Sequence, residues 1–425
     1  MMFRSLQPVF ACVFLLCICG RAAAEPDSTA ISGNPAATNI TVGSGWLGDY
    51  LGINRNGWRF AGLNITDINA QLTGGVQPGQ WTVNNLTVFD LSIDTEKYLG
   101  WEGGLFGTEF LFYSGGATNH NAGTVMGYSS LDAGPPRTRQ QIYQLWYRQQ
   151  LFNKKLTVRV GKSTPTYDFN NVVRSVPFND PEYNIPSLSS AILTPLFISP
   201  MLCGILPGYY DSATGLVASL TPNKNFYIQY GMFDGNKAAG RHTGLEGPHF
   251  NGYYLHLVEA GSNWTVGSEQ KPGKFGIGYW KQTGLLERDG ITVRGADGMY
   301  LFGSQRLYYE RPGQSDDGIS VYFQFGASDS AVISTHRYIG CGITFFGPLP
   351  CRDDDSAGFA FAYGSMNPDP TLDLGPRELI YSWYYQYRVN PNCFLQPNIS
   401  YIGQPAAEPG LSDVFALTMR AILLF

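Results

Sequence analysis

The last thirteen residues of the chain, 413–425, alternate between two kinds of side chain. One face is apolar and carries Phe415, Leu417, Met419, Ala421, Leu423 and Phe425. The other face is smaller and more mixed, with Val414, Ala416, Thr418, Arg420, Ile422 and Leu424. A period of two residues predicts a β-strand, and a strand that crosses a bilayer at a tilt needs ~9–11 residues. With an open edge such a strand would aggregate in water, so we expect it to close a membrane barrel.

The same alternation recurs along the chain and is interrupted by turn-forming residues. We predict an all-β fold of sixteen strands. They span residues 64–76, 84–95, 104–114, 139–151, 155–163, 212–221, 225–233, 250–262, 273–284, 298–310, 318–328, 337–347, 356–366, 377–390, 393–403 and 413–425. The mean repeat is about 23 residues, which matches a long strand and one connection.

The predicted connections differ in length according to their order. Those after odd-numbered strands are long and include 115–138, 164–211, 234–249, 285–297, 366–376 and 404–412. The shortest ones, 152–154, 222–224 and 391–392, all follow even-numbered strands. Outer-membrane barrels have long external loops and short periplasmic turns. The pattern therefore predicts a transmembrane antiparallel β-barrel whose last strand ends in the periplasm.

Alternation also assigns side chains to the lumen. Glu109 lies on one face of the third strand, Arg148 on one face of the fourth, with Tyr143 on the opposite face, and Arg159 on one face of the fifth. An Arg or Lys facing lipid near the bilayer midplane costs ~2–4 kcal/mol. These charged faces are therefore predicted to line a wet lumen, which makes the barrel a channel.

The beginning of the chain is typical of an exported protein. Residues 1–24 form a predicted signal peptide, with Arg4, an apolar run of eleven residues and Ala22-Ala23-Ala24. Residues 25–63 are predicted to be a periplasmic leader and a short entry segment, and 64–425 the barrel. Loss of Arg4 and Arg21 leaves 26 basic against 33 acidic residues, a net charge of −7 that argues against a nucleic-acid partner. With 51 Gly and 52 Tyr and Phe residues, the chain suits a many-stranded sheet with aromatic girdles.

The connection 164–211 is the longest and follows the fifth strand, the position of the third external loop. It is rich in proline and carries apolar residues that include Ile192, Leu193, Leu196, Phe197 and Ile198. A long loop of this kind is usually functional, and its apolar side chains need burial. We expect it to fold into the pore; an apolar cap or a subunit contact at the rim is the alternative.

Several local strings of the chain form a recognisable set. They are Gly48-Asp49-Tyr50-Leu51-Gly52 after Trp46, Gly62-Leu63-Asn64-Ile65, Leu145-Trp146-Tyr147-Arg148-Gln149, Arg159-Val160-Gly161-Lys162, Asp168-Phe169, Pro177-Phe178 and the terminal Phe425. Together they resemble the OprB-type carbohydrate-selective porins of Gram-negative outer membranes. The resemblance implies a sixteen-stranded barrel, often a homotrimer in porins, that passes glucose and other small sugars by facilitated diffusion. It also implies surroundings of outer-membrane lipid and lipopolysaccharide. A general porin, or one that prefers anions or amino acids, is the alternative with the same barrel.

Sugar transit needs polar partners for hydroxyl groups and flat apolar faces, held weakly enough for release. Candidate residues at the constriction are Glu109, Trp146, Arg148, Arg159, Lys162 and Asp168, with Trp146 as a ring for stacking. A wall-stabilising ladder of salt bridges between Glu109 and the two arginines is the alternative. Asp67, Asp90 and Asp94 extend the polar path or are merely solvated lining.

Other chemistry has weaker support. Asp353-Asp354-Asp355 could gather Ca²⁺, although a solvated turn is the favoured interpretation. The five histidines lack metal-binding spacing, and no catalytic or cofactor motif is present, so we expect neither an enzyme nor a cofactor. After export four cysteines remain: Cys203, Cys341, Cys351 and Cys393. A disulfide of Cys351 with Cys341 or Cys393 is favoured over free thiols.

Overall fold

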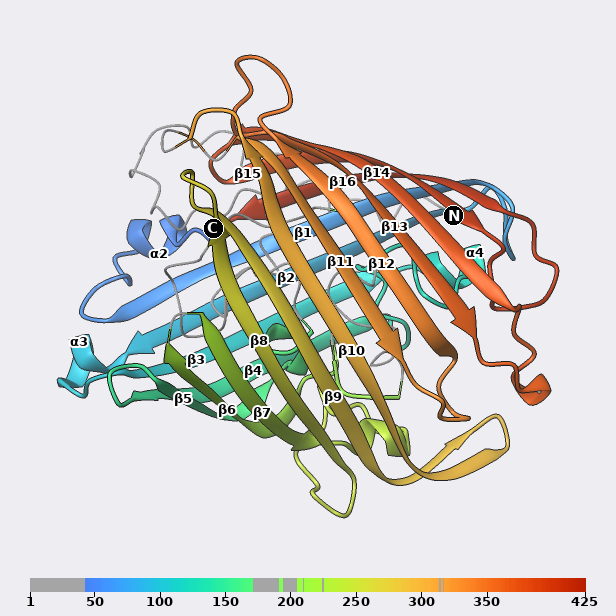
Figure 1. The fold of residues 1–425 in the computed structure, drawn as a ribbon, viewed down its shortest axis with the longest axis horizontal. Coiled ribbons are helices and arrows are strands. Elements are labelled where there is room, and N and C mark those ends of the chain that lie inside the picture. The colour runs from blue at the N-terminus through green and yellow to red at the C-terminus, as the bar shows by residue number, and fades with distance from the viewer. Residues whose placement is uncertain are drawn as a thin grey trace, which may run out of the picture. The chain divides into compact units, whose positions relative to one another are not determined.

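The computed structural model describes residues 43–170, 191–193, 205–208, 210–223, 225–312, 315 and 317–425. In this part of the chain sixteen antiparallel strands form a closed barrel, each paired with its neighbours in sequence and β1 paired with β16 (Figure 1). The strands are β1 Trp58–Thr73, β2 Trp81–Asp94, β3 Gly104–Gly115, β4 Thr138–Leu151, β5 Leu156–Ser163, β6 Ala213–Asn223, β7 Phe226–Asp234, β8 Tyr254–Val266, β9 Lys271–Arg288, β10 Ile291–Tyr309, β11 Gly318–Ala327, β12 Thr335–Phe346, β13 Ser356–Met366, β14 Arg377–Asn390, β15 Cys393–Gly403 and β16 Val414–Leu424. The predicted all-β barrel of sixteen strands is confirmed.

Short helices lie outside the barrel strands. They are the α-helices α2 Trp46–Tyr50, α3 Thr95–Leu99 and α4 Thr118–Ala122 and the 3₁₀ helices η2 Pro165–Tyr167, η5 Asn236–Ala239 and η6 Pro370–Leu372. Among the described residues, none of the helices has the length and apolar character that crossing a membrane would require. The predicted signal peptide and leader residues up to 42 lie outside the described residues.

The C-terminal strand closes the barrel against β1, with Leu63 opposite Leu424 in the register. Gly62 and Phe425 exchange two backbone hydrogen bonds of 2.7 and 2.8 Å. The indole of Trp46 donates to the carbonyl of Leu424 at 2.8 Å. The chain end is therefore held by β1 and by the segment that precedes it.

The predicted alternation of faces is observed along β16. Its outward residues Phe415, Leu417 and Met419 are 37%, 40% and 46% exposed, whereas the inward Thr418 and Arg420 are buried. On β14 the outward Trp383 is exposed and the inward Glu378, Ser382 and Gln386 are buried. The inward faces are thus largely polar and the outward faces largely apolar, as in a membrane barrel.

One face assignment on the fourth strand was wrong. We expected Tyr143 to lie on the face opposite Gln144, but both side chains are buried. The register shifts here, because Glu109 pairs with Gln144 while the next residue, Phe110, pairs with Ile142. A β-bulge adds one residue to β4 and turns Tyr143 to the inside.

Three predicted boundaries also differ from the structure. Strand β1 begins at Trp58 rather than at residue 64, and β8 begins at Tyr254 rather than at residue 250. The predicted loop 285–297 is replaced by a longer β9–β10 hairpin with a two-residue turn (Figure 1). Asp289 and Gly290 have φ values of 48° and 83°, the left-handed pair that a tight hairpin turn requires. This Asp-Gly turn signal was missed.

The predicted disulfides of Cys351 are not formed. Cys341 and Cys351 are free thiols, and Cys341 lies within β12 whereas Cys351 lies in the turn after that strand. Residues 342–346 continue the strand between Cys341 and the turn, a rise of about 17 Å at ~3.3 Å per residue. That separation is far beyond the ~7 Å limit between Cα atoms in a disulfide. Cys203 lies outside the described residues.

The third loop is described only in part. Its first residues, 164–170, are buried and contact the inward faces of β7, β8 and β11. Ala191, Ile192 and Leu193 are also buried, and the Ile192 carbonyl accepts from Ser130 N at 2.7 Å. Residues 171–190 and 194–204 lie outside the described residues, so the folding of the whole loop into the pore stays a prediction.

Candidate solute-binding site

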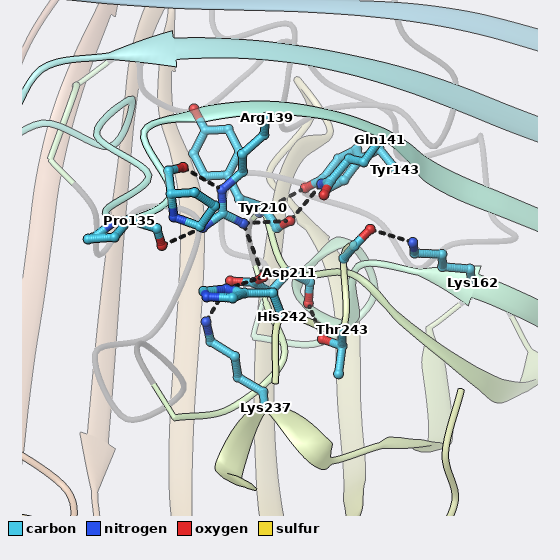
Figure 2. A network of polar contacts seen from close by, with 12 residues as sticks. Pro135, Arg139, Gln141, Tyr143, Lys162, Tyr210, Asp211, Lys237, His242 and Thr243 are labelled. Atoms are coloured by element: carbon cyan, nitrogen blue, oxygen red, sulfur yellow. Dashed lines mark hydrogen bonds and ion pairs between the residues drawn. The ribbon is translucent and has the colours of Figure 1, made fainter. Parts of the chain in front are cut away.

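Asp211 lies two residues before the start of β6. Its carboxylate is surrounded by three basic side chains (Figure 2). It accepts hydrogen bonds from Arg139 Nη1 at 3.0 Å and from Lys237 Nζ at 2.8 Å. The Nδ1 atom of His242 lies 3.5 Å from the same carboxylate. Arg139 comes from β4, Lys237 from η5 and His242 from the connection after η5, so Asp211 joins separate parts of the barrel.

Neighbouring contacts extend this network at the end of the barrel where the long connections lie. Arg139 also donates to the carbonyl oxygens of Pro135 and Pro136, at 3.0 and 3.1 Å. Gln141 Nε2 donates to the Tyr210 carbonyl at 2.8 Å, and Lys162 Nζ donates to the Gly244 carbonyl at 2.5 Å (Figure 2). The network joins β4, β5 and the segment before β6 to the connection after β7.

The charge of Asp211 is maintained by its neighbours. Burial opposes ionisation, but Lys237 and Arg139 outweigh it and hold the pKa of the Asp211 carboxyl below its usual value. Asp211 is therefore ionised at neutral pH, and its contacts with Arg139 and Lys237 are ion pairs.

A second ion pair lies deeper, between Arg159 of β5 and Asp168, which follows η2. Both side chains are 1% exposed, and Arg159 also donates to Ser163 Oγ at 3.3 Å. The guanidinium carbon of Arg159 lies 5.6 Å from the ring centroid of the buried Trp146. Of the predicted site residues, Arg159, Trp146 and Asp168 are therefore brought together, with the Trp146 ring packed against the Arg159 guanidinium.

Glu259 of β8 forms a third polar centre inside the barrel. Its Oε1 atom accepts from Tyr227 Oη at 2.9 Å and from Gln229 Nε2 at 3.0 Å. Its Oε2 atom accepts from Tyr300 Oη at 2.9 Å and from Asn170 N at 2.7 Å. Donors from β7, from β10 and from the third loop thus meet at one fully buried carboxyl group of β8.

The other predicted acidic residues lie elsewhere on the wall. Asp67 pairs with Arg420, and Asp90 lies 3.2 Å from Arg59. Asp94 caps the N-terminus of α3 by accepting from the backbone of Glu96 and Lys97. Asp67 is therefore a buried, paired group, which differs from the solvated lining that we favoured.

The predicted ladder of Glu109 with the two arginines has a different geometry. Glu109 is buried on β3 and lies opposite Asp90 and Gln144 in the register. Arg148 lies opposite Leu105 and Arg159, at another level of the wall. Arg159 pairs instead with Asp168, which the ladder did not include.

Sequence reasoning missed Arg139, Asp211, Lys237 and Glu259. Arg139 and Glu259 occupy inward positions of strands with clear alternation, so parity alone could have identified them. Asp211 and Lys237 lie in connections, where no periodicity indicates which side chains meet. Their contact depends on how the segment before β6 and the connection after β7 fold toward each other.

The aspartate run 353–355 is engaged by arginines. Asp353 pairs with Arg311, Asp354 with Arg388 at 2.8 Å, and Asp355 with Arg352 at 2.6 Å. Among the described residues, no cluster of three His, Cys, Asp or Glu side chains could hold a metal ion. Asp353 and Asp354 are exposed in a turn, as the favoured interpretation expected, whereas Asp355 is buried.

The comparison with known families decides the class of this barrel. The family described as carbohydrate-selective porin, OprB family, matches residues 82–423. The chain belongs to the OprB family. This porin is 24% identical to Porin B of Pseudomonas aeruginosa over 450 residues, covering 92% of this chain and 93% of that protein.

Solved structures support the fold of the porin. The high-pH structure of Pseudomonas putida OprB matches with a TM-score of 0.75 at 17% identity, covering 92% of this chain and 99% of the other. The low-pH structure of the same protein matches with a TM-score of 0.56 at 15% identity and the same coverage. Family and fold are those of a channel rather than an enzyme, and they locate the porin in the Gram-negative outer membrane.

Proposed function

We propose that this porin mediates passive diffusion of small sugars, with glucose among them. The observation that carries the proposal is the set of buried amide side chains on the inward faces of the strands. They are Asn69, Asn84, Gln141, Gln144, Gln229, Asn263, Gln282, Gln324, Gln386, Gln396 and Asn398. An amide offers both donors and an acceptor, as a sugar hydroxyl does, and it carries no charge.

The charged inward groups support a neutral solute as well. Arg159 pairs with Asp168, Arg139 and Lys237 pair with Asp211, and Arg420 pairs with Asp67. Opposite charges at these distances largely cancel each other's field, so they favour neither cations nor anions strongly. They still offer hydrogen-bonding groups to a passing hydroxyl.

Within this proposal, the Arg159–Asp168 pair forms part of the wall beside the passing sugar, and Trp146 supports Arg159 from beneath. The contacts must remain weak enough for release, because conduction requires both entry and exit. The apolar outward faces support contact with outer-membrane lipid, including lipopolysaccharide in the outer leaflet.

Proteoliposome swelling tests the proposal. Glucose is expected to enter faster than a zwitterionic amino acid of similar size, and glucose should reduce ion conductance through the channel in planar bilayers. Equal swelling rates for the two solutes would instead identify a general diffusion porin.

A further inference from the structure

The first seven residues of the third loop, 164–170, form a buried segment that leaves β5 and reaches distant strands. Gln229 of β7 donates to the Asp168 carbonyl at 2.7 Å. Gln324 of β11 donates to the carbonyl and the side-chain oxygen of Asn170, at 3.1 and 3.3 Å. Because β5 and β11 lie six strands apart around the barrel, the segment spans the interior.

The carboxyl group of Glu259 holds the end of this segment. It accepts the backbone N–H of Asn170 at 2.7 Å and also accepts from three side-chain donors. Gln324 makes longer contacts with Asn170, of 3.1 and 3.3 Å. The shortest described hydrogen bond to Asn170 is thus the one to Glu259.

The position of Asn170 also affects the neighbouring ion pair between Asp168 and Arg159. Asp168 lies two residues before Asn170, and Gln229 Nε2 donates both to the Asp168 carbonyl and to Glu259 Oε1. Asp168 in turn is the ionic partner of Arg159. A shift of Asn170 therefore moves Asp168. It changes the contact between Asp168 and Arg159, and with it the polar lining of the lumen at this point.

We propose that Glu259 is a positioning residue that sets the width and the polar lining of the passage. It keeps residues 164–170 across the interior and Asp168 against Arg159, without itself contacting the solute. The part of this inference that concerns sugar preference rests on the proposed function; the part that concerns width does not.

Glu259→Gln tests the role with little change of volume, because the amide supplies one acceptor atom where the carboxylate supplies two. The matched control is Glu310→Gln, which makes the same substitution at an exposed position. We expect single-channel conductance to rise in Glu259→Gln and the preference for glucose over the amino acid to be lost, while Glu310→Gln matches the wild-type porin. Single-channel records count only inserted barrels, so a lower folded yield does not alter the readout.

Equal conductance and equal preference in the two variants would overturn the proposal, and so would a lower yield of otherwise unchanged channels. If Glu259→Gln yields no folded barrel, Gln324→Ala removes the other hold on Asn170 and should raise conductance; unchanged conductance there contradicts the proposal. A wild-type porin without sugar preference would defeat the proposed function, whereas the conductance comparison would still decide the positioning role.

Discussion

Arg420 donates two hydrogen bonds of 2.7 Å to the carboxylate of Asp67, across the two strands that close the barrel. Both side chains are almost fully buried. The pair connects the first strand to the last, whose residues are separated by nearly the whole chain. This long-range contact is a place where the loss of one charge should be costly.

Asp67→Asn should therefore destabilise the barrel by about 3–5 kcal/mol, because Arg420 would remain buried without its ionic partner. The free energy of unfolding in denaturant, measured on the refolded porin in detergent, checks this value. Replacing both residues together by Leu and Met should recover much of the loss. A double variant as unstable as the single one would contradict this account.

Gly278 of β9 lies directly opposite Tyr300 of β10. A Cβ atom at Gly278 would lie 2.1 Å from Tyr300 Cζ, so Gly278→Ala should force the ring away from the wall. Overpacking of this kind typically costs about 1–3 kcal/mol. We expect a lower unfolding midpoint for Gly278→Ala than for Gly247→Ala, whose added methyl group meets no atom within 4 Å. Equal midpoints would show that the ring moves freely.

The contacts of Asp211 should depend on pH. Lys237 and Arg139 outweigh the effect of burial and hold the pKa of Asp211 below its usual value, and His242 faces the same carboxylate. A depressed folded pKa gives stability that is present above the unfolded value of about 3.9 and is lost as pH falls through the folded pKa. The difference in thermal midpoint between wild type and Asp211→Asn should be present above about pH 4 and shrink below it. The exposed Glu408→Gln variant is the control, and a difference that grows below about pH 4 would refute the assignment.

Substitution of Arg159 should lower the apparent glucose affinity more than substitution of Arg148. Arg159→Ala removes the partner of Asp168, and a lost hydrogen bond to a charged group of ~1.5–3 kcal/mol corresponds to about tenfold or more in apparent glucose affinity. Arg148→Ala should alter glucose block of conductance less, because Asp168 pairs with Arg159. Glucose titration in planar bilayers measures both, with Arg337→Ala at the exposed rim as a control. Unchanged affinity in Arg159→Ala would move the site elsewhere.

Period-two alternation predicted the strands, since a side chain's face depends only on its position along a strand. The two clear failures have local causes. The bulge at Tyr143 and Gln144 breaks the parity of β4, and the Asp289-Gly290 turn converts a predicted loop into a hairpin. The barrel formed by residues 64–425 could therefore be predicted without knowledge of the tertiary contacts.

The sequence by itself thus determined which side chains face inward, because that property is periodic and local. It assigned Glu109 and Arg159 to inward faces of their strands, and both side chains are buried. Only the tertiary structure decided which of these groups meet. Asp67 with Arg420 and Glu259 with Asn170 are contacts between residues far apart in the chain, and they form because the barrel closes and its interior is small.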